Sequence, residues 1–234
     1  LLYHQAGDNR SAIASIDRAL AQAPGTALYL GSRGVVLLAT GDLTAARDAL
    51  EVARRGRPDD PKILTNLGLA VDRSGDPTSA GPLHDIALKA DPYCVDALIN
   101  SGNLSERQND IGAAIADLVK AHELSPDNPD ILNNLGFACL SGNRTDQARQ
   151  ALTKALALDP EHVEAAVNLA HLDLLTGNFV AGWRGYEARR PRAGWHVVHP
   201  ACPEWRGEEP VGKHVLLVCE QGYGDAIQFS RPAI

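Results

Sequence analysis

Four asparagines recur at one spacing in a chain of 234 residues. A carboxamide carries hydrogen-bond donors and an acceptor, so a row of amides can bind the main chain of an extended polypeptide whatever its side chains are. Asparagine is less favourable than alanine inside a helix, which indicates that a further interaction retains it. The amides either contact a bound peptide, or they have a structural role, as bridges between neighbouring units or simply as polar groups that keep the surface hydrated. Both interpretations stay open. The four residues, each 34 positions after the one before, are Asn66, Asn100, Asn134 and Asn168.

A second group of residues that could bind a ligand lies further along the sequence. Residues 213–219 form an apolar run of strand length, and the segment EQGYGD follows at 220–225. An apolar strand, a glycine-containing turn and the start of a helix make up the opening of an α/β unit. Gly222 and Gly224 would let this turn approach a ligand closely, and the N-terminus of the following helix would favour an anion. We therefore predict that residues 213–234 form the β-strand–turn–helix start of an incomplete α/β domain.

A metal site is the third possibility, and the sequence argues against it. His196, His199 and Cys202 have a spacing that metal ligands can adopt, but they lie in a proline-rich segment without an evident fourth ligand. Structural zinc sites use four ligands. The cysteines of the chain form no C-x-x-C pair, which excludes the usual zinc-knuckle and redox motifs. We predict no metal and no cofactor.

The elements that position the four asparagines follow from a repeat with the same period. Three further series of residues recur every 34 positions: one of prolines and two of small side chains. A period of this length is typical of solenoids built from helix–turn–helix units. The three series are Pro24, Pro58, Pro92, Pro126 and Pro160; Ala12, Ala46, Ala80, Ala114, Ala148 and Gly182; and Ala19, Ala53, Ala87, Ala121 and Ala155.

If the repeat is numbered so that Ala46 is position 20, the asparagines take position 6 of its first helix. Positions 4 and 24 supply an apolar stripe at helical spacing, and His84 at position 24 is interpreted as a partly buried helix residue. Because successive helical residues turn by about 100°, position 6 lies roughly opposite the stripe. Position 8 is small, so that the two helices of a hairpin can approach closely. Its residues are Gly34, Gly68, Gly102, Gly136 and Ala170.

The pattern L-x-x-L-G, then A-x-x-x-L, then P resembles the tetratricopeptide repeat family. The resemblance covers roughly residues 1–190. It implies an all-α fold, a solenoid of antiparallel helix pairs in a right-handed superhelix. It also implies that the first helices, and with them the asparagines, line a concave groove that holds a protein or an extended peptide. The clearest copy of the pattern is formed by Leu132, Leu135, Gly136, Ala148, Leu152 and Pro160.

A longer string of residues resembles bacterial tetratricopeptide proteins that carry a C-terminal glycosyltransferase domain. That domain is similar to the heptosyltransferase-type enzymes of the GT-B fold, and the similarity spans about residues 183–231. The string consists of Trp183, Tyr186, Glu187, Arg189, Arg190, Pro203, Trp205 and Gly207, followed by the apolar run and the glycine turn.

This second resemblance implies a catalytic role for Asp225. In these relatives the aspartate of the first glycine turn is a candidate general base on the acceptor hydroxyl, a role that suits a carboxylate. The alternative is that Asp225 only caps the helix that begins after it. A GT-B enzyme needs two Rossmann-like halves, so the chain is expected to be a catalytically inactive fragment. A nucleotide-sugar is expected as a partner only of the full-length parent.

Three regions are therefore predicted: residues 1–190 as a solenoid of about five and a half repeats, residues 191–212 as a linker, and residues 213–234 as a truncated Rossmann-like domain. The predicted function is a peptide-binding scaffold that recruits substrates for a larger bacterial glycosyltransferase; the alternative is a stand-alone adaptor without enzymatic activity. A net charge of −7 argues against a nucleic-acid partner. No apolar run reaches the about 18 residues of a membrane span, and a cytoplasmic location is predicted.

Overall fold

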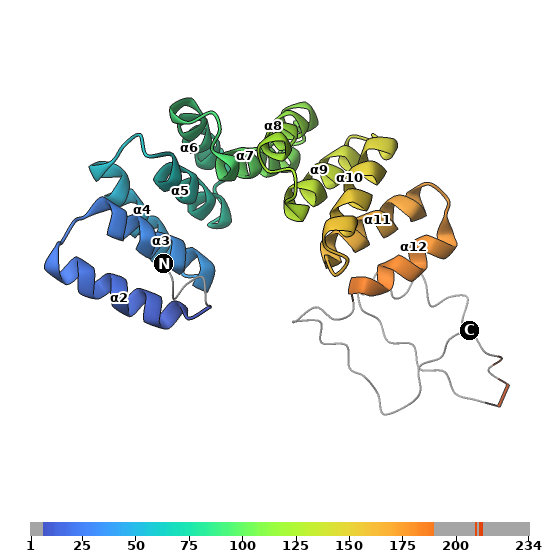
Figure 1. Ribbon diagram of the computed structural model, residues 1–234, viewed down its shortest axis with the longest axis horizontal. Helices are drawn as coiled ribbons and strands as arrows, with labels where there is room; N and C mark the ends of the chain where they lie inside the picture. Colours follow the sequence, from blue (N-terminus) through green and yellow to red (C-terminus); the bar gives the residue numbers. More distant parts are fainter. Residues whose placement is uncertain (1–6, 190–208, 210, 213–234) are drawn as a thin grey trace. The chain divides into compact units, whose positions relative to one another are not determined.

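The computed structural model describes residues 7–189, 209 and 211–212. These residues contain eleven α-helices and one 3-10 helix, η1. After the first helix, the others follow one another along the chain as antiparallel pairs (Figure 1). The elements are α2 (Asn9–Gln22), α3 (Ala27–Thr40), α4 (Leu43–Gly56), α5 (Pro61–Arg73), α6 (Pro77–Ala90), α7 (Val95–Arg107), α8 (Ile111–Leu124), α9 (Pro129–Ser141), α10 (Thr145–Leu158), α11 (Val163–Leu175), α12 (Phe179–Tyr186) and η1 (Glu187–Arg189).

The fold is all-helical, which corrects the predicted fold class. A solenoid of helix pairs is present as expected, but no strand occurs among the described residues, and the β-strand–turn–helix start of an α/β domain is not seen. That prediction depended on one apolar run of strand length, and a short apolar run does not distinguish a strand from other structure by its periodicity. Residues 213–234, on which the prediction fell, lie outside the described part of the chain.

The chain divides into two compact units, Leu1–Ala188 and Arg189–Ile234, and helices α2 to α12 belong to the first. Within it the hairpins are α3–α4, α5–α6, α7–α8, α9–α10 and α11–α12, and each packs on the hairpin before it. Each first helix also contacts the first helix of the next hairpin, whereas successive second helices make no comparable contact within the described unit. The first helices α3, α5, α7, α9 and α11 therefore lie on the inner side of the stack, where neighbouring hairpins are closest.

Glycine at position 8 lets the two helices of a hairpin pack tightly, as the repeat predicted. A Cβ atom placed on Gly136 would lie 2.6 Å from Cγ of Leu152, which is fully buried at position 24 of the same hairpin. Such a distance is far below van der Waals contact, so only glycine leaves room for the leucine. The same pairing of positions 8 and 24 holds in the other hairpins with a glycine at position 8. The pairs are Gly34 with Leu50, Gly68 with His84, and Gly102 with Leu118.

The turns inside the hairpins have the left-handed backbone that their glycines and asparagines predicted. Gly41 and Gly75 have φ angles of 81° and 92°, and the non-glycine residues Asn109 and Asn143 have φ angles of 64° and 55°. Asparagine tolerates this region better than most residues with a side chain. The residue after the turn caps the second helix. Asp110, for example, accepts a hydrogen bond of 3.1 Å from the backbone N–H of Ala113.

Two second helices, α10 and α12, lack this cap, and the defect at α10 predicts a stabilising substitution. Arg144 precedes α10 and makes no side-chain capping bond, although its backbone angles (φ −92°, ψ 66°) nearly equal those of Asp110 (φ −89°, ψ 73°). Arg144→Asp is therefore expected to raise the free energy of unfolding by about 1 kcal/mol, because the carboxylate would accept from the first turn and face the positive end of the helix dipole. Urea unfolding followed by circular dichroism measures the change.

The alanine variant separates the two causes of this gain. Arg144→Ala removes the unfavourable positive charge but adds no acceptor, so it should recover only part of the increase. If Arg144→Asp is no more stable than Arg144→Ala, the capping argument is wrong.

Candidate functional site

One face of the first helices carries the predicted asparagines. Positions 2, 6, 9 and 13 of the repeat lie four, three and four residues apart, so their side chains share one side of a helix. On α5, α7, α9 and α11 we call these sixteen side chains the first-helix face. Its members are Lys62, Asn66, Leu69 and Arg73; Asp96, Asn100, Asn103 and Arg107; Asp130, Asn134, Phe137 and Ser141; and Glu164, Asn168, His171 and Leu175.

The amides do not form a uniform ladder. All four are half-buried, but their hydrogen bonds differ. Asn168 Nδ2 donates to Asn133 Oδ1 of the preceding hairpin at 2.9 Å, so this amide bridges neighbouring repeats. Asn66 Nδ2 donates to the backbone carbonyl of Lys62 in its own helix at 2.7 Å. The Asn100 side chain makes no hydrogen bond within the described residues. The bridging interpretation therefore holds for Asn168, and contact with a bound peptide stays a prediction.

Asn133 is a member of this network that the sequence did not indicate. Asn133 is only 8% exposed. Its Nδ2 donates a hydrogen bond of 3.4 Å to Oδ1 of Asn134. It sits at position 5 of the repeat, where the other hairpins carry no asparagine. The bond from Asn168 gives the buried Oδ1 atom of Asn133 a hydrogen-bond donor. The α9–α11 part of the series therefore has a structural role.

A hollow of about 420 Å³ opens on the first-helix face between α5 and α7. Asp72 of α5 and Arg107 of α7 form an ion pair across it, and this pair ties the two hairpins together. Arg73 makes no ion pair or hydrogen bond within the described residues. The two arginines and one aspartate give the hollow a net positive charge in a chain whose overall charge is −7. The lining residues are Leu69, Asp72, Arg73, Asn100, Asn103 and Arg107.

Most of these lining residues escaped the sequence analysis. Asn100 was singled out because it recurs, whereas Asn103, Arg73 and Arg107 occupy positions 9 and 13, whose residue types change from repeat to repeat. The available signal was positional. Residues three and seven positions after the recurring asparagine share its face of the helix, whatever their type. A search of that stripe for polar side chains would have found Arg73, Asn103 and Arg107.

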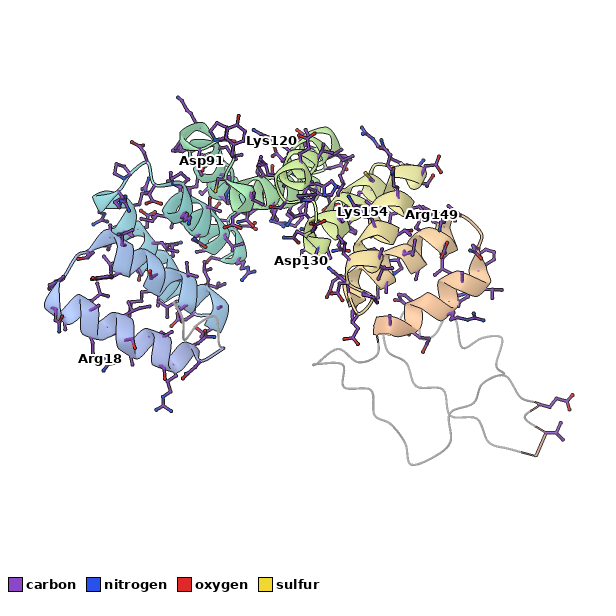
Figure 2. The ribbon with its side chains drawn as sticks, in the orientation of Figure 1. Arg18, Asp91, Lys120, Asp130, Arg149 and Lys154 are labelled. Carbon is purple, nitrogen blue, oxygen red and sulfur yellow. The ribbon has the colours of Figure 1, made fainter. Side chains whose placement is uncertain are left out.

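The other end of the first-helix face, formed by position 2 in the N-terminal turns, is mostly acidic. Asp130 lies at the start of α9 (Figure 2), and its Oδ1 is 3.1 Å from Nε2 of the buried His162. The Nδ1 atom of His162 accepts a hydrogen bond of 3.2 Å from the backbone N–H of Ala165 and lies 3.6 Å from Oε2 of Glu164. His162 therefore caps α11 through Nδ1 and donates from Nε2 to Asp130, a carboxylate near the N-terminus of α9.

Polar bridges between successive hairpins hold them in register. Arg149 of α10 (labelled in Figure 2) forms an ion pair of 2.8 Å with the buried Asp173 of α11, and its other terminal nitrogen donates to Thr176 at 3.3 Å. Ser141 of α9 donates to Glu106 of α7 at 2.7 Å. These contacts fix the spacing of the first helices, and so the distances between the side chains of the first-helix face.

The other predicted site residues lie outside the described part of the chain. This applies to Asp225, to Gly222 and Gly224, and to the three potential metal ligands of residues 196–202. Within the described residues, no group of His, Cys, Asp and Glu side chains is arranged to hold a metal ion. None of the described helices is long and apolar enough to cross a bilayer.

Several solved structures have a similar fold. PilW, a type IV pilus biogenesis factor, matches with a TM-score of 0.72 and 23% identity, over 82% of this chain and 90% of PilW. PilF of Pseudomonas aeruginosa matches with a TM-score of 0.64 and 22% identity, over 72% of this chain and 77% of its own. YrrB, described as a TPR protein with an unusual peptide-binding site, matches with a TM-score of 0.55 and 21% identity, over 70% and 84%. At these identities the likeness shows the fold alone.

Sequence comparison assigns the family. No curated protein sequence matches the chain significantly. Family models described as tetratricopeptide repeat match residues 1–61, 65–129, 106–154 and 143–181. None of these matches supports the expected glycosyltransferase domain. The matched segments cover well over half of the 234 residues and coincide with the helical hairpins, so the chain belongs to the tetratricopeptide repeat family.

Proposed function

We propose that this chain is a protein-binding scaffold that holds an extended peptide on its first-helix face, at the hollow between α5 and α7. The observation that carries the proposal is the state of Asn100. Its half-buried amide lines the hollow and has no hydrogen-bond partner within the described residues. An amide that is partly exposed in a hollow and makes no bond to the described residues can bond to a ligand there.

The chemistry of the hollow fits a peptide main chain. The carboxamides of Asn100 and Asn103 lie three residues apart on one helix and each offers donors and an acceptor, which is what a peptide bond requires. Arg73 adds an unpaired cation, and Leu69 adds apolar surface. Stacked hairpins present such side chains on a continuous surface, which is how repeat proteins generally bind extended partners. YrrB, a protein of the same fold, is described as having a peptide-binding site, and this supports the proposal.

The proposal is confined to this binding function. The narrower role, a substrate-recruiting arm of a bacterial glycosyltransferase, depended on the resemblance of residues 183–231 alone, and the comparisons give it no support. A nucleotide-sugar partner has no support either. The stand-alone adaptor and the cytoplasmic location stay predictions from the sequence.

Replacing the two amides of the hollow tests the proposed function. A peptide is first selected from a random library against the wild-type chain, and its Kd is then measured by fluorescence polarisation. Asn100→Ala combined with Asn103→Ala is expected to raise Kd about tenfold or more, because each lost hydrogen bond contributes about 1 kcal/mol. Helicity should stay unchanged, because both side chains point away from the core.

Gln147→Ala is the matched control. Gln147 is an exposed amide on the second helix α10, so its removal should leave Kd unchanged. The proposal is wrong if the library yields no peptide that binds, or if the selected peptide binds the double variant as tightly as the wild type.

A further inference from the structure

The second hairpin carries a histidine where the others carry an apolar side chain. At position 24, Leu50, Leu118 and Leu152 fill the space beside a position-8 glycine. His84 takes this place on α6. A Cβ atom on Gly68 would lie 2.5 Å from its Cε1 and 2.9 Å from both ring nitrogens, so the imidazole fills the space completely.

This imidazole is buried without the partner that its nitrogen needs. His84 is only 2% exposed, and its Nδ1 atom has no hydrogen-bond partner within the described residues. A buried polar atom without a partner weakens a fold, and a charged ring in the same place would weaken it far more. The leucines of the other hairpins carry no such penalty.

Two of the three charged groups that act on His84 belong to the helices that form the hollow. Asp72 of α5, Asp85 of α6 and Arg107 of α7 act electrostatically on the ring, and two of them, Asp72 and Arg107, line the hollow. Burial lowers the pKa of His84 below its ordinary value of 6.5; the two aspartates act in the opposite sense and Arg107 in the same sense. The folded hairpin therefore holds the imidazole neutral.

We propose that His84 makes the second hairpin, and with it the peptide site between α5 and α7, sensitive to mild acid. Protonation of the imidazole expels it from its place beside Gly68, and the departure of α6 from α5 displaces Asp72 from Arg107. The effect on the hairpin stands on its own, whereas the effect on peptide binding rests on the proposed function.

The direction of the effect follows from proton linkage. Above pH 6.5 the histidine is neutral in both the folded and the opened hairpin, and its contribution to stability is fully present. As the pH falls below 6.5, the opened hairpin binds a proton that the folded one does not bind, and stability is lost. The equilibrium between folded and opened hairpin shifts by up to about tenfold per pH unit until the lowered pKa of the folded state is reached.

Two other kinds of titrating group require a control. Burial lowers the pKa of His122, and the positive charge of the nearby Lys154 lowers it further. This histidine therefore titrates in the same window as His84. The capping carboxylates Asp8 and Asp76 have pKa values lowered by the hydrogen bonds from Ser11 and Ser79, and they lose their contribution only as the pH falls below 3.8. The difference between the wild type and a His84 variant therefore isolates His84.

The test compares the full wild-type chain with His84→Leu between about pH 8 and pH 5, by urea unfolding and by hydrogen exchange of α5 and α6. We expect the wild type to lose at least about tenfold more in its folding equilibrium constant than the variant, with the added exchange confined to this hairpin. His84→Gln, which is polar but does not titrate, replaces the leucine variant if that one fails to fold. Parallel pH profiles for the wild type and the variant would overturn the proposal.

A second measurement separates this proposal from the proposed function. The library-selected peptide is titrated against both proteins at about pH 8 and about pH 5.5. Equal Kd values at the higher pH and weaker binding by the wild type alone at the lower pH support the regulation. Peptide binding that weakens equally for the wild type and the variant at the lower pH would overturn it. Absence of binding at both pH values refutes the peptide site, and the unfolding profiles then decide the effect on the hairpin.

Discussion

Replacing Gly136 with valine is expected to lower the free energy of unfolding by about 3 kcal/mol, near the upper end of what overpacking costs in a core. The Cβ atom alone would lie 2.6 Å from Cγ and 2.7 Å from Cδ2 of Leu152. Valine adds two methyl groups beyond that atom. Leu152 is fully buried and cannot move aside, so α9 and α10 must separate. Urea unfolding measured by circular dichroism gives the loss.

Two variants show whether the clash with Leu152 is the cause. Gly136→Val combined with Leu152→Ala should be more stable than the sum of the single effects by about 1–2 kcal/mol, because the alanine vacates the space that valine needs. Gly81→Ala is the control for a helical glycine with room beside it, since its nearest atom would be Cδ2 of Leu104 at 3.8 Å. This control should gain up to about 1 kcal/mol from helix propensity. A wild-type stability for Gly136→Val would contradict the packing argument.

The hairpins could be predicted because their determinants are local or strictly periodic. Gly136 and Leu152 lie on two helices joined by one short turn, so their spacing in the sequence fixes their contact. The turn residues Asn109 and Asn143 similarly act within a few bonds of their own backbone. Such features appear in a sequence as residue types at constant positions, and the structure confirms them.

The details of the candidate site depend on how one hairpin stacks on the next. The bond from Asn168 to Asn133 joins residues 35 positions apart, one more than the repeat, so the period alone does not reveal it. The hollow likewise combines Arg73 of one repeat with Asn100 and Asn103 of the next. Whether an amide meets a neighbouring side chain or an open hollow is decided by residues that do not recur, and a pattern of recurring residues cannot show it.

The incorrect part of the fold prediction had the weakest physical basis. The solenoid was supported by several residue classes over five periods, whereas the α/β start was inferred from a single apolar run and a glycine turn at residues 213–225. A strand gains its stability from the backbone hydrogen bonds of neighbouring strands, and one isolated run offers none. The all-helical class is the correct one for the described chain.

Replacing Leu118 with alanine is expected to lower the free energy of unfolding by about 3 kcal/mol, the loss typical of a fully buried leucine. Leu118 of α8 is 1% exposed and packs beside Gly102 of α7, the helix that carries Asn100. It also belongs to a buried cluster that includes Cys139 of α9 and Leu172 of α11, and so joins three successive hairpins. The cavity left by alanine therefore lies at the centre of the solenoid.

The position of Leu118 also affects how the chain unfolds. Repeats in a solenoid contact only their neighbours, so weakening a central hairpin uncouples the hairpins on either side. We expect the urea transition of Leu118→Ala to broaden as well as to shift. Leu124→Ala is the matched control, because Leu124 ends the same helix but is 39% exposed, and its loss should stay below about 1 kcal/mol. Equal losses for the two variants would contradict the burial argument, and a transition that shifts without broadening would mean that α8 does not couple its neighbours.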